Sequence, residues 1–187
     1  MDFKDKTYII TGATSGIGRC IAYTLAKKGA RLLLLGRDIK RLNSLTNELN
    51  LISQTSHSVA VFDSNNLDSI ESAVAEFASE FKLNGFIHSA GALNPMLLCD
   101  LNLAKMHELI NINLLTFFAL AKSALKHGRY AKGDTSIVAI SSMAAFGAEP
   151  GLSVYSASKA ALNSAVRSLA KEYSKKGVRI NAVAPLF

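Results

Sequence analysis

Six short apolar runs alternate along the chain with segments that repeat apolar residues every three or four positions. The runs are nearly continuous rather than alternating, which is typical of strands buried on both faces of a parallel sheet. They lie at Tyr8–Thr11, Leu32–Leu35, Val59–Phe62, Gly85–Ala90, Ile137–Ile140 and Ile180–Ala184.

The segments between these runs have helical spacing. Three of them carry apolar trios, at Ile17, Ile21 and Leu25, at Leu42, Leu45 and Leu49, and at Ile70, Val74 and Phe77; two longer ones span about 103–127 and 151–176. Six strands alternating with five helices predict an α/β fold with a doubly wound parallel sheet, the Rossmann fold. No linker or repeat interrupts the 187 residues, so we expect one domain over 1–187.

Composition narrows the class of protein. A charged fraction of 19% is ordinary for a globular chain, and no apolar run is long enough for a membrane span. The net charge of +7 comes from scattered basic residues without interleaved aromatics, which does not favour a nucleic-acid partner.

Cys20 and Cys99 fit neither a disulfide framework nor a metal site, and we expect both as apolar filler in a reducing compartment. No signal peptide is recognisable at the start, so the expected location is cytoplasmic.

A glycine-rich turn follows the first predicted strand and opens the first predicted helix, the place where a dinucleotide pyrophosphate binds a parallel sheet. Its glycines allow a tight turn, close approach of phosphate to the main chain and close packing of the helix. It is not a phosphate-binding loop of the Gly-Lys-Ser/Thr type. The residues expected to contact the cofactor here are Gly12, Thr14, Ser15, Gly16, Ile17 and Gly18.

Arg37 stands about twenty residues further on, where an NAD-binding fold usually presents an acid to the ribose hydroxyls. A guanidinium at this point can bind a 2′-phosphate through charge-assisted hydrogen bonds, so we expect NADP rather than NAD. The neighbouring acid, Asp38, instead favours NAD, unless it serves as a helix N-cap.

The stretch from Ser141 to Lys159 carries the candidate acid–base chemistry. On a helix, Tyr155 and Lys159 are four positions apart and share a face. An ammonium roughly 5 Å from the phenol, at an effective dielectric near 20, favours the phenolate by about 3 kcal/mol. That effect would bring the tyrosine pKa toward neutrality, where it can exchange a proton with a carbonyl or alcohol oxygen. Ser142 could donate a hydrogen bond to the same oxygen.

With these motifs in order, the chain resembles the short-chain dehydrogenase/reductase family over essentially its whole length, and most closely the branch with 3-oxoacyl-[acyl-carrier-protein] reductases. The family's TGxxxGxG turn matches Thr11, Gly12, Gly16 and Gly18. Its active-site residues match Asn113, Ser142, Tyr155 and Lys159, with Ser141 and Asn111 as weaker alternatives for two of them. Its remaining cofactor contacts match Asp63, Ala90 and Gly91, and Tyr155 and Lys159 also touch the cofactor.

The resemblance implies a mechanism. NADPH delivers hydride to a carbonyl carbon, Tyr155 supplies the proton and Ser142 polarises the oxygen. Lys159 lowers the tyrosine pKa and holds the nicotinamide ribose, while Asn113 supports a water that replaces the proton. It also implies a small carbonyl or alcohol substrate, no metal, and a homo-oligomer, dimer or tetramer, built on the two longest helices. Apolar residues that could wall the substrate site, or simply pack in the core, are Leu93, Met96, Leu97, Ala144, Ala145, Phe146 and Leu152.

Two departures from the family pattern matter. His88-Ser89-Ala90-Gly91 replaces the usual Asn-Asn-Ala-Gly, and we assign His88 no chemistry. The chain then stops at Phe187, where relatives continue with a substrate-covering segment, a helix and a seventh strand. The sequence therefore suggests a C-terminally truncated member. A second hypothesis follows from this, a truncated cofactor-binding or scaffold protein with little or no catalysis.

Overall fold

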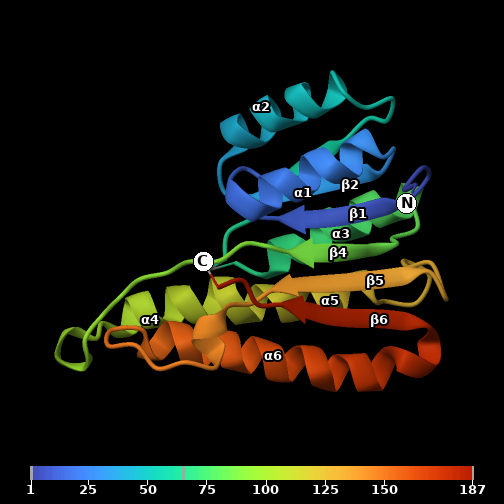
Figure 1. Cartoon of the computed structure of the whole chain (residues 1–187). Coiled ribbons are helices and arrows are strands. Elements are labelled where there is room, and N and C mark those ends of the chain that lie inside the picture. Colours follow the sequence, from blue (N-terminus) through green and yellow to red (C-terminus); the bar gives the residue numbers. More distant parts are fainter. Residues whose placement is uncertain (1, 65, 187) are drawn as a thin grey trace.

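The computed structural model describes residues 2–64 and 66–186. Within them, six parallel strands form one sheet in the order β3-β2-β1-β4-β5-β6 (Figure 1). The predicted fold class is confirmed. The strands are β1 (Thr7–Thr11), β2 (Arg31–Gly36), β3 (Ser58–Val61), β4 (Gly85–His88), β5 (Thr135–Ile140) and β6 (Val178–Val183).

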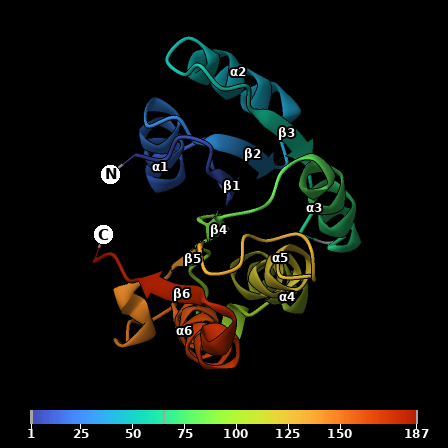
Figure 2. The same ribbon diagram turned by 90° about the vertical axis from the view of Figure 1, so that its right-hand side faces the viewer.

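Helices cover the sheet on two sides, as the end view in Figure 2 shows. One apolar cluster, including Ile10, Leu34 and Leu42, joins the sheet to α1 (Gly16–Lys27) and α2 (Ile39–Asn50). The other, centred on Phe86 and Phe117, joins it to α3 (Asp68–Glu80), α5 (Thr116–Ala124) and α6 (Ser153–Tyr173). The remaining helical segments are α4 (Leu103–Ile110), η1 (Leu98–Asp100), η2 (Asn111–Leu115), η3 (Met143–Ala145) and η4 (Ser174–Lys176).

The long helix predicted over 103–127 is interrupted. Between α4 and α5, the five residues of η2 form a π-helical turn, in which the N–H of Thr116 bonds to the carbonyl oxygen of Asn111. Such a turn inserts one extra residue without ending the helix and often marks a functional site. It carries Asn113.

The helix predicted over 151–176 is shorter than expected at both ends. Gly151 has a left-handed conformation with φ of +78°, so the helix begins at Ser153. At the other end, the chain tightens into η4 and stops at Gly177, which is again left-handed.

Burial of the strands on both faces is confirmed for the centre of the sheet and is wrong for its edges. Every residue of β4 is buried, whereas burial alternates along β5 and only Val178 and Ile180 are buried in β6. The apolar cluster centred on Phe86 and Phe117 covers one face of β5 and β6. On the opposite face of β6, Arg179 and Asn181 are exposed.

The strand order reverses between β1 and β4, since β2 and β3 lie on one side of β1 while β4, β5 and β6 lie on the other. In open α/β sheets this switch point, at the carboxyl ends of the strands, is where ligands bind. The carboxyl ends of β1, β4 and β5 therefore define the edge at which the predicted site residues should meet.

Both cysteines, Cys20 and Cys99, are exposed, so the expectation that they are buried filler is wrong.

Among the described residues, no helix has both the length and the apolar character that crossing a bilayer requires.

Candidate active site

A cavity of about 870 Å³ opens at the carboxyl edge of the sheet. It brings together Ser142, Tyr155 and Lys159, three of the four residues predicted to be catalytic, beside the predicted cofactor contacts Ile17 and Gly91. Ser142 comes from the end of β5, Tyr155 and Lys159 from the first turns of α6. The cavity thus unites residues far apart in the sequence.

Ser142 lies in extended conformation just before η3 and caps that short helix. Its Oγ atom accepts a hydrogen bond of 3.1 Å from the main-chain N–H of Ala144. A hydroxyl that already accepts one bond keeps its own proton available. Ser142 is therefore oriented so that it can still donate to an oxygen in the cavity. The alternative, Ser141, is buried, and its hydroxyl contacts the carbonyl oxygen of Lys159.

Lys159 is buried, with 4% of the residue exposed, and its Nζ atom donates to the carbonyl oxygen of Ile140 at 2.8 Å. Burial lowers the pKa of this amine to about 8. The ammonium nitrogen lies 5.9 Å from the centre of the Tyr155 ring, so the two side chains share a face of α6 as the spacing predicts.

Asn113 is fully buried in the π-helical turn and is not among the residues that line the cavity. Its Oδ1 atom accepts from the N–H of Ala92 at 2.8 Å, while Nδ2 donates to the carbonyl of Ala92 at 3.1 Å and to Ser158 Oγ at 3.0 Å. Both amide donors are thus used, whereas Oδ1 keeps one acceptor position. The alternative, Asn111, instead accepts a bond from Thr116 through its main-chain carbonyl.

Gly91 brings the main chain close to both of these groups. A Cβ atom at position 91 would lie 3.2 Å from Asn113 Oδ1 and 3.4 Å from Lys159 Nζ. Because glycine has no Cβ, the main chain can lie beside the amide oxygen and the ammonium without crowding them.

The glycine turn packs closely against the end of β4. A Cβ on Gly12 would come within 2.6 Å of the nitrogen of Ala90, and one on Gly18 within 2.3 Å of the carbonyl oxygen of Gly12. Around Gly16, by contrast, a Cβ would meet nothing within 4 Å. Thr14, Ser15 and Gly16 form the turn that leads into α1, with Ser15 and Gly16 exposed. A tight turn with an open outer side at a helix N-terminus fits a dinucleotide pyrophosphate.

Arg37 and Asp63 follow β2 and β3, on the other side of the switch point, and both are exposed. The Arg37 guanidinium makes an ion pair with Glu108, at 3.6 Å between Nη1 and Oε1. Asp38 is an N-cap, since its Oδ1 atom accepts from the N–H groups of Lys40 and Arg41 at 2.9 and 3.1 Å. Asp38 therefore has the N-cap role that the sequence suggested as an alternative.

His88, the departure in the fourth strand, is completely buried. Its Nδ1 atom shares a hydrogen bond of 3.0 Å with Thr11 Oγ1, and that oxygen accepts from the N–H of Ala90 at 3.2 Å. Nε2 has no hydrogen-bond partner among the described residues. Burial, reinforced by the charge of Lys159, lowers the pKa of His88 to about 3. His88 is thus a neutral ring that links β4 to the glycine turn.

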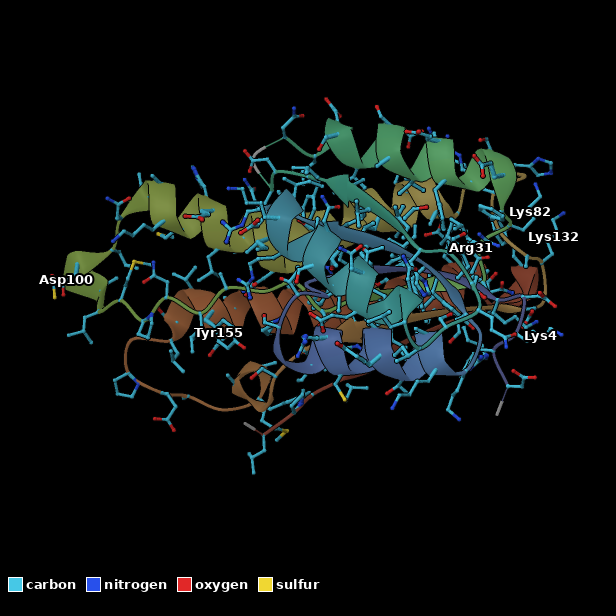
Figure 3. The ribbon with its side chains drawn as sticks, turned by 90° about the horizontal axis from the view of Figure 1, so that it is seen from above. Lys4, Arg31, Lys82, Asp100, Lys132 and Tyr155 are labelled. Carbon is cyan, nitrogen blue, oxygen red and sulfur yellow. The ribbon has the colours of Figure 1, made fainter. Side chains whose placement is uncertain are left out.

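The expected apolar wall is formed in part. Leu93, Ala144, Phe146 and Leu152 line the cavity, whereas Met96, Leu97 and Ala145 do not. A larger cavity of about 1050 Å³, bordered by Lys4 and Arg31, lies at the amino edge and contains none of the predicted site residues. Figure 3 shows Lys4 and Arg31 at the opposite end of the molecule from Tyr155.

Three residues that bind the predicted site residues were not predicted from the sequence. Ile140 holds the amine of Lys159, Ser158 fixes Asn113, and Glu108 pairs with Arg37. A main-chain carbonyl, a small polar residue within a helix and one surface acid carry no local signal. Each becomes visible only when the chain is folded.

Comparisons with known proteins identify the family of this chain. The family model for short chain dehydrogenases matches residues 6–187. The 3-oxoacyl-[acyl-carrier-protein] reductase FabG of Rickettsia bellii is 32% identical over 190 residues, covering 100% of this chain and 74% of the relative. An uncharacterised oxidoreductase of Staphylococcus epidermidis is 28% identical, with 97% and 77% of the two chains covered.

Solved structures show the same fold. A short chain dehydrogenase from Burkholderia cenocepacia in complex with NADP superimposes with a TM-score of 0.92 at 26% identity, covering 99% of this chain and 75% of that one. A short-chain type dehydrogenase/reductase from Mycobacterium ulcerans also gives 0.92, covering 100% and 69%. The chain belongs to the short-chain dehydrogenase/reductase family, in its FabG-like branch. It is an oxidoreductase of a family that binds NAD(P).

Proposed function

We propose that the chain is an NADP-dependent carbonyl reductase or alcohol dehydrogenase, with 3-oxoacyl thioesters among the candidate substrates. The observation that carries the proposal is the meeting of Ser142, Tyr155 and Lys159 in one cavity beside the glycine turn. The similarity to FabG, a 3-oxoacyl-[acyl-carrier-protein] reductase, supports the substrate class. The bound nicotinamide would supply the hydride.

In this proposal Tyr155 donates its phenolic proton to the substrate oxygen, and Ser142 donates a hydrogen bond to the same atom. Ser142 is suited to this because its oxygen already accepts from Ala144 and its proton is free. Lys159 favours the phenolate that Tyr155 becomes, because a positive charge close by stabilises the negative oxygen. Its burial strengthens this effect, since water screens the charge less.

In this proposal Asn113 supports the water through which the proton is replaced. Its amide fixes Ala92 through two hydrogen bonds, and Oδ1, close to Gly91 and Lys159, keeps one acceptor position. A water bound to Asn113 Oδ1 could bridge to Lys159 Nζ. Through such a water the proton lost by Tyr155 is replaced.

The cofactor contacts follow the carboxyl edge. Gly12, Thr14, Ser15, Gly16, Ile17 and Gly18 would hold the pyrophosphate at the N-terminus of α1, and Ala90 and Gly91 would approach it along β4. Asp63 would meet the adenine. Arg37 would bind the 2′-phosphate, and its exposed guanidinium leaves it accessible for this role.

Location and assembly belong to the same proposal. We place the protein in the cytoplasm as a homo-oligomer that associates through α5 and α6. Support comes from Leu115 and Phe118, which leave 38% and 41% of their surface exposed next to this helix pair.

The experiment that tests the function is an assay of NADPH oxidation by the 187-residue chain with short 3-oxoacyl thioesters and simple ketones. The proposal expects consumption of NADPH that depends on the carbonyl compound. Tight NADPH binding without turnover of any carbonyl compound would instead support the scaffold hypothesis.

A further inference from the structure

We propose that Glu108 sets the cofactor preference of this enzyme by competing with the 2′-phosphate of NADPH for the guanidinium of Arg37. The inference rests on the proposed function, because it requires a dinucleotide at the carboxyl edge. It adds a residue on α4 to the specificity determinants and predicts a chain that discriminates only moderately between NADPH and NADH.

The starting observation is the ion pair itself. Arg37 Nη1 and Glu108 Oε1 lie 3.6 Å apart, with 63% and 52% of the two side chains exposed. Each side chain is therefore accessible from solvent and free to change partner. An exposed ion pair of this kind contributes little to stability, so Arg37 can exchange Glu108 for another anion at little cost.

The position of the pair connects it to ligand binding. Arg37 directly follows β2, in the first half of the sheet, whereas Glu108 lies on α4, which packs on α6 in the second half. The pair thus joins the two halves at the carboxyl edge, beyond which α4 extends (Figure 1). Crevices at this edge hold the ligand in folds of this kind.

The chemistry favours competition. A guanidinium binds a phosphate best through a bidentate fork, and a carboxylate on one of its nitrogens occupies part of that fork. A 2′-phosphate that reaches Arg37 also meets the negative charge of Glu108. The 2′-hydroxyl of NADH carries no charge and can donate a hydrogen bond to a carboxylate. Glu108 therefore weakens NADPH binding while it leaves NADH binding unchanged or improves it.

The test is a fluorescence titration of the full chain with NADPH and with NADH, for the wild type and for Glu108→Gln. We expect the ratio of the NADH to the NADPH dissociation constant to rise by about two- to fivefold in Glu108→Gln, the size that exposed ion pairs support. Glu80→Gln is the matched control. It removes the same charge at the C-terminal end of α3, where Glu80 is exposed, and should leave the ratio unchanged.

A double variant tests whether the effect of Glu108 acts through Arg37. In an Arg37→Gln background the effect of Glu108→Gln on the ratio should shrink, because there is no guanidinium left to compete for. If the wild type binds both cofactors and Glu108→Gln leaves the ratio unchanged or lowers it, the inference is wrong while the proposed function stands. If the wild type binds neither cofactor, the proposed function fails and the inference fails with it.

Discussion

Lys159 is held by Ile140: its ammonium nitrogen donates a hydrogen bond of 2.8 Å to the carbonyl oxygen at the end of β5. This bond ties the first turns of α6 to the strand that leads into Ser142. It also keeps the amine buried beside Tyr155, where its charge acts at short range.

The first prediction concerns pH. Burial lowers the pKa of Lys159 to about 8, so the amine is charged below that pH and neutral above it. Because the charged form favours the phenolate, the rate of carbonyl reduction should fall as pH rises through about 8. The measurement is the turnover number at saturating NADPH from about pH 6 to about pH 10. A rate that stays level to the alkaline end would show that the charge of Lys159 is not needed.

The second prediction concerns the water proposed to bridge Asn113 and Lys159 beside Gly91. Gly91→Ala places a methyl group 3.2 Å from Asn113 Oδ1 and 3.4 Å from Lys159 Nζ, where it would crowd the water proposed to bridge these two groups. The backbone there is not left-handed, so alanine should be tolerated in the fold. We expect turnover to fall by about tenfold or more, because proton replacement is impaired.

The readout that separates this effect from general damage is the melting temperature, measured together with NADPH affinity. The melting temperature should change little in Gly91→Ala, and turnover is compared at saturating NADPH because Gly91 is itself a proposed cofactor contact. A variant that keeps full turnover would contradict the proposed water between Asn113 and Lys159.

The third prediction concerns the glycine turn. Gly12→Ala introduces a Cβ 2.6 Å from the nitrogen of Ala90 at a residue with φ of +69°, whereas Gly128→Ala has φ of +85° but meets nothing within 4 Å. Backbone strain alone costs about 1–2 kcal/mol. Urea unfolding should therefore show a small loss for Gly128→Ala and a loss of at least about 3 kcal/mol for Gly12→Ala. Equal losses would mean that the close contact with β4 does not matter.

The fourth prediction concerns acid stability. His88 has a folded-state pKa of about 3, below the value near 6.5 of an unfolded chain, because it is buried. Between these two values the unfolded chain binds a proton that the folded chain excludes. The free energy of unfolding should therefore decrease as pH falls from about 6.5, by up to about 1.4 kcal/mol per pH unit.

His88→Asn should reduce this slope, since asparagine does not titrate. His107→Asn serves as the control, because His107 is exposed on α4. His57, whose pKa burial lowers to about 4, contributes equally to all three proteins. An identical slope in wild type and His88→Asn would rule out His88 as the source.

Much of this architecture could be predicted from local patterns. The run Leu32–Leu35 correctly predicted a buried strand, and the trio Leu42, Leu45 and Leu49 correctly predicted the helix after it. A strand buried on both faces gives a continuous apolar run, whereas a helix repeats apolar residues every three or four positions. The spacing of Tyr155 and Lys159 likewise fixes their common face, because it depends on a single helix.

Other features depend on contacts that a pattern does not contain. The π-helical turn at Asn113 inserts one residue into an apolar helix, and an apolar sequence looks the same with or without it. Arg37 was predicted from its position after β2, but its partner Glu108 is 71 residues away on another element.

The central claim, proton donation by Tyr155 in an NADPH-dependent carbonyl reduction, is tested most directly by Tyr155→Phe. Turnover and NADPH binding should be measured on the same sample, with Tyr173→Phe at the far end of α6 as the control. The account predicts a loss of turnover by a factor of about 10² or more in Tyr155→Phe, with NADPH affinity nearly unchanged. Turnover retained in Tyr155→Phe would contradict it.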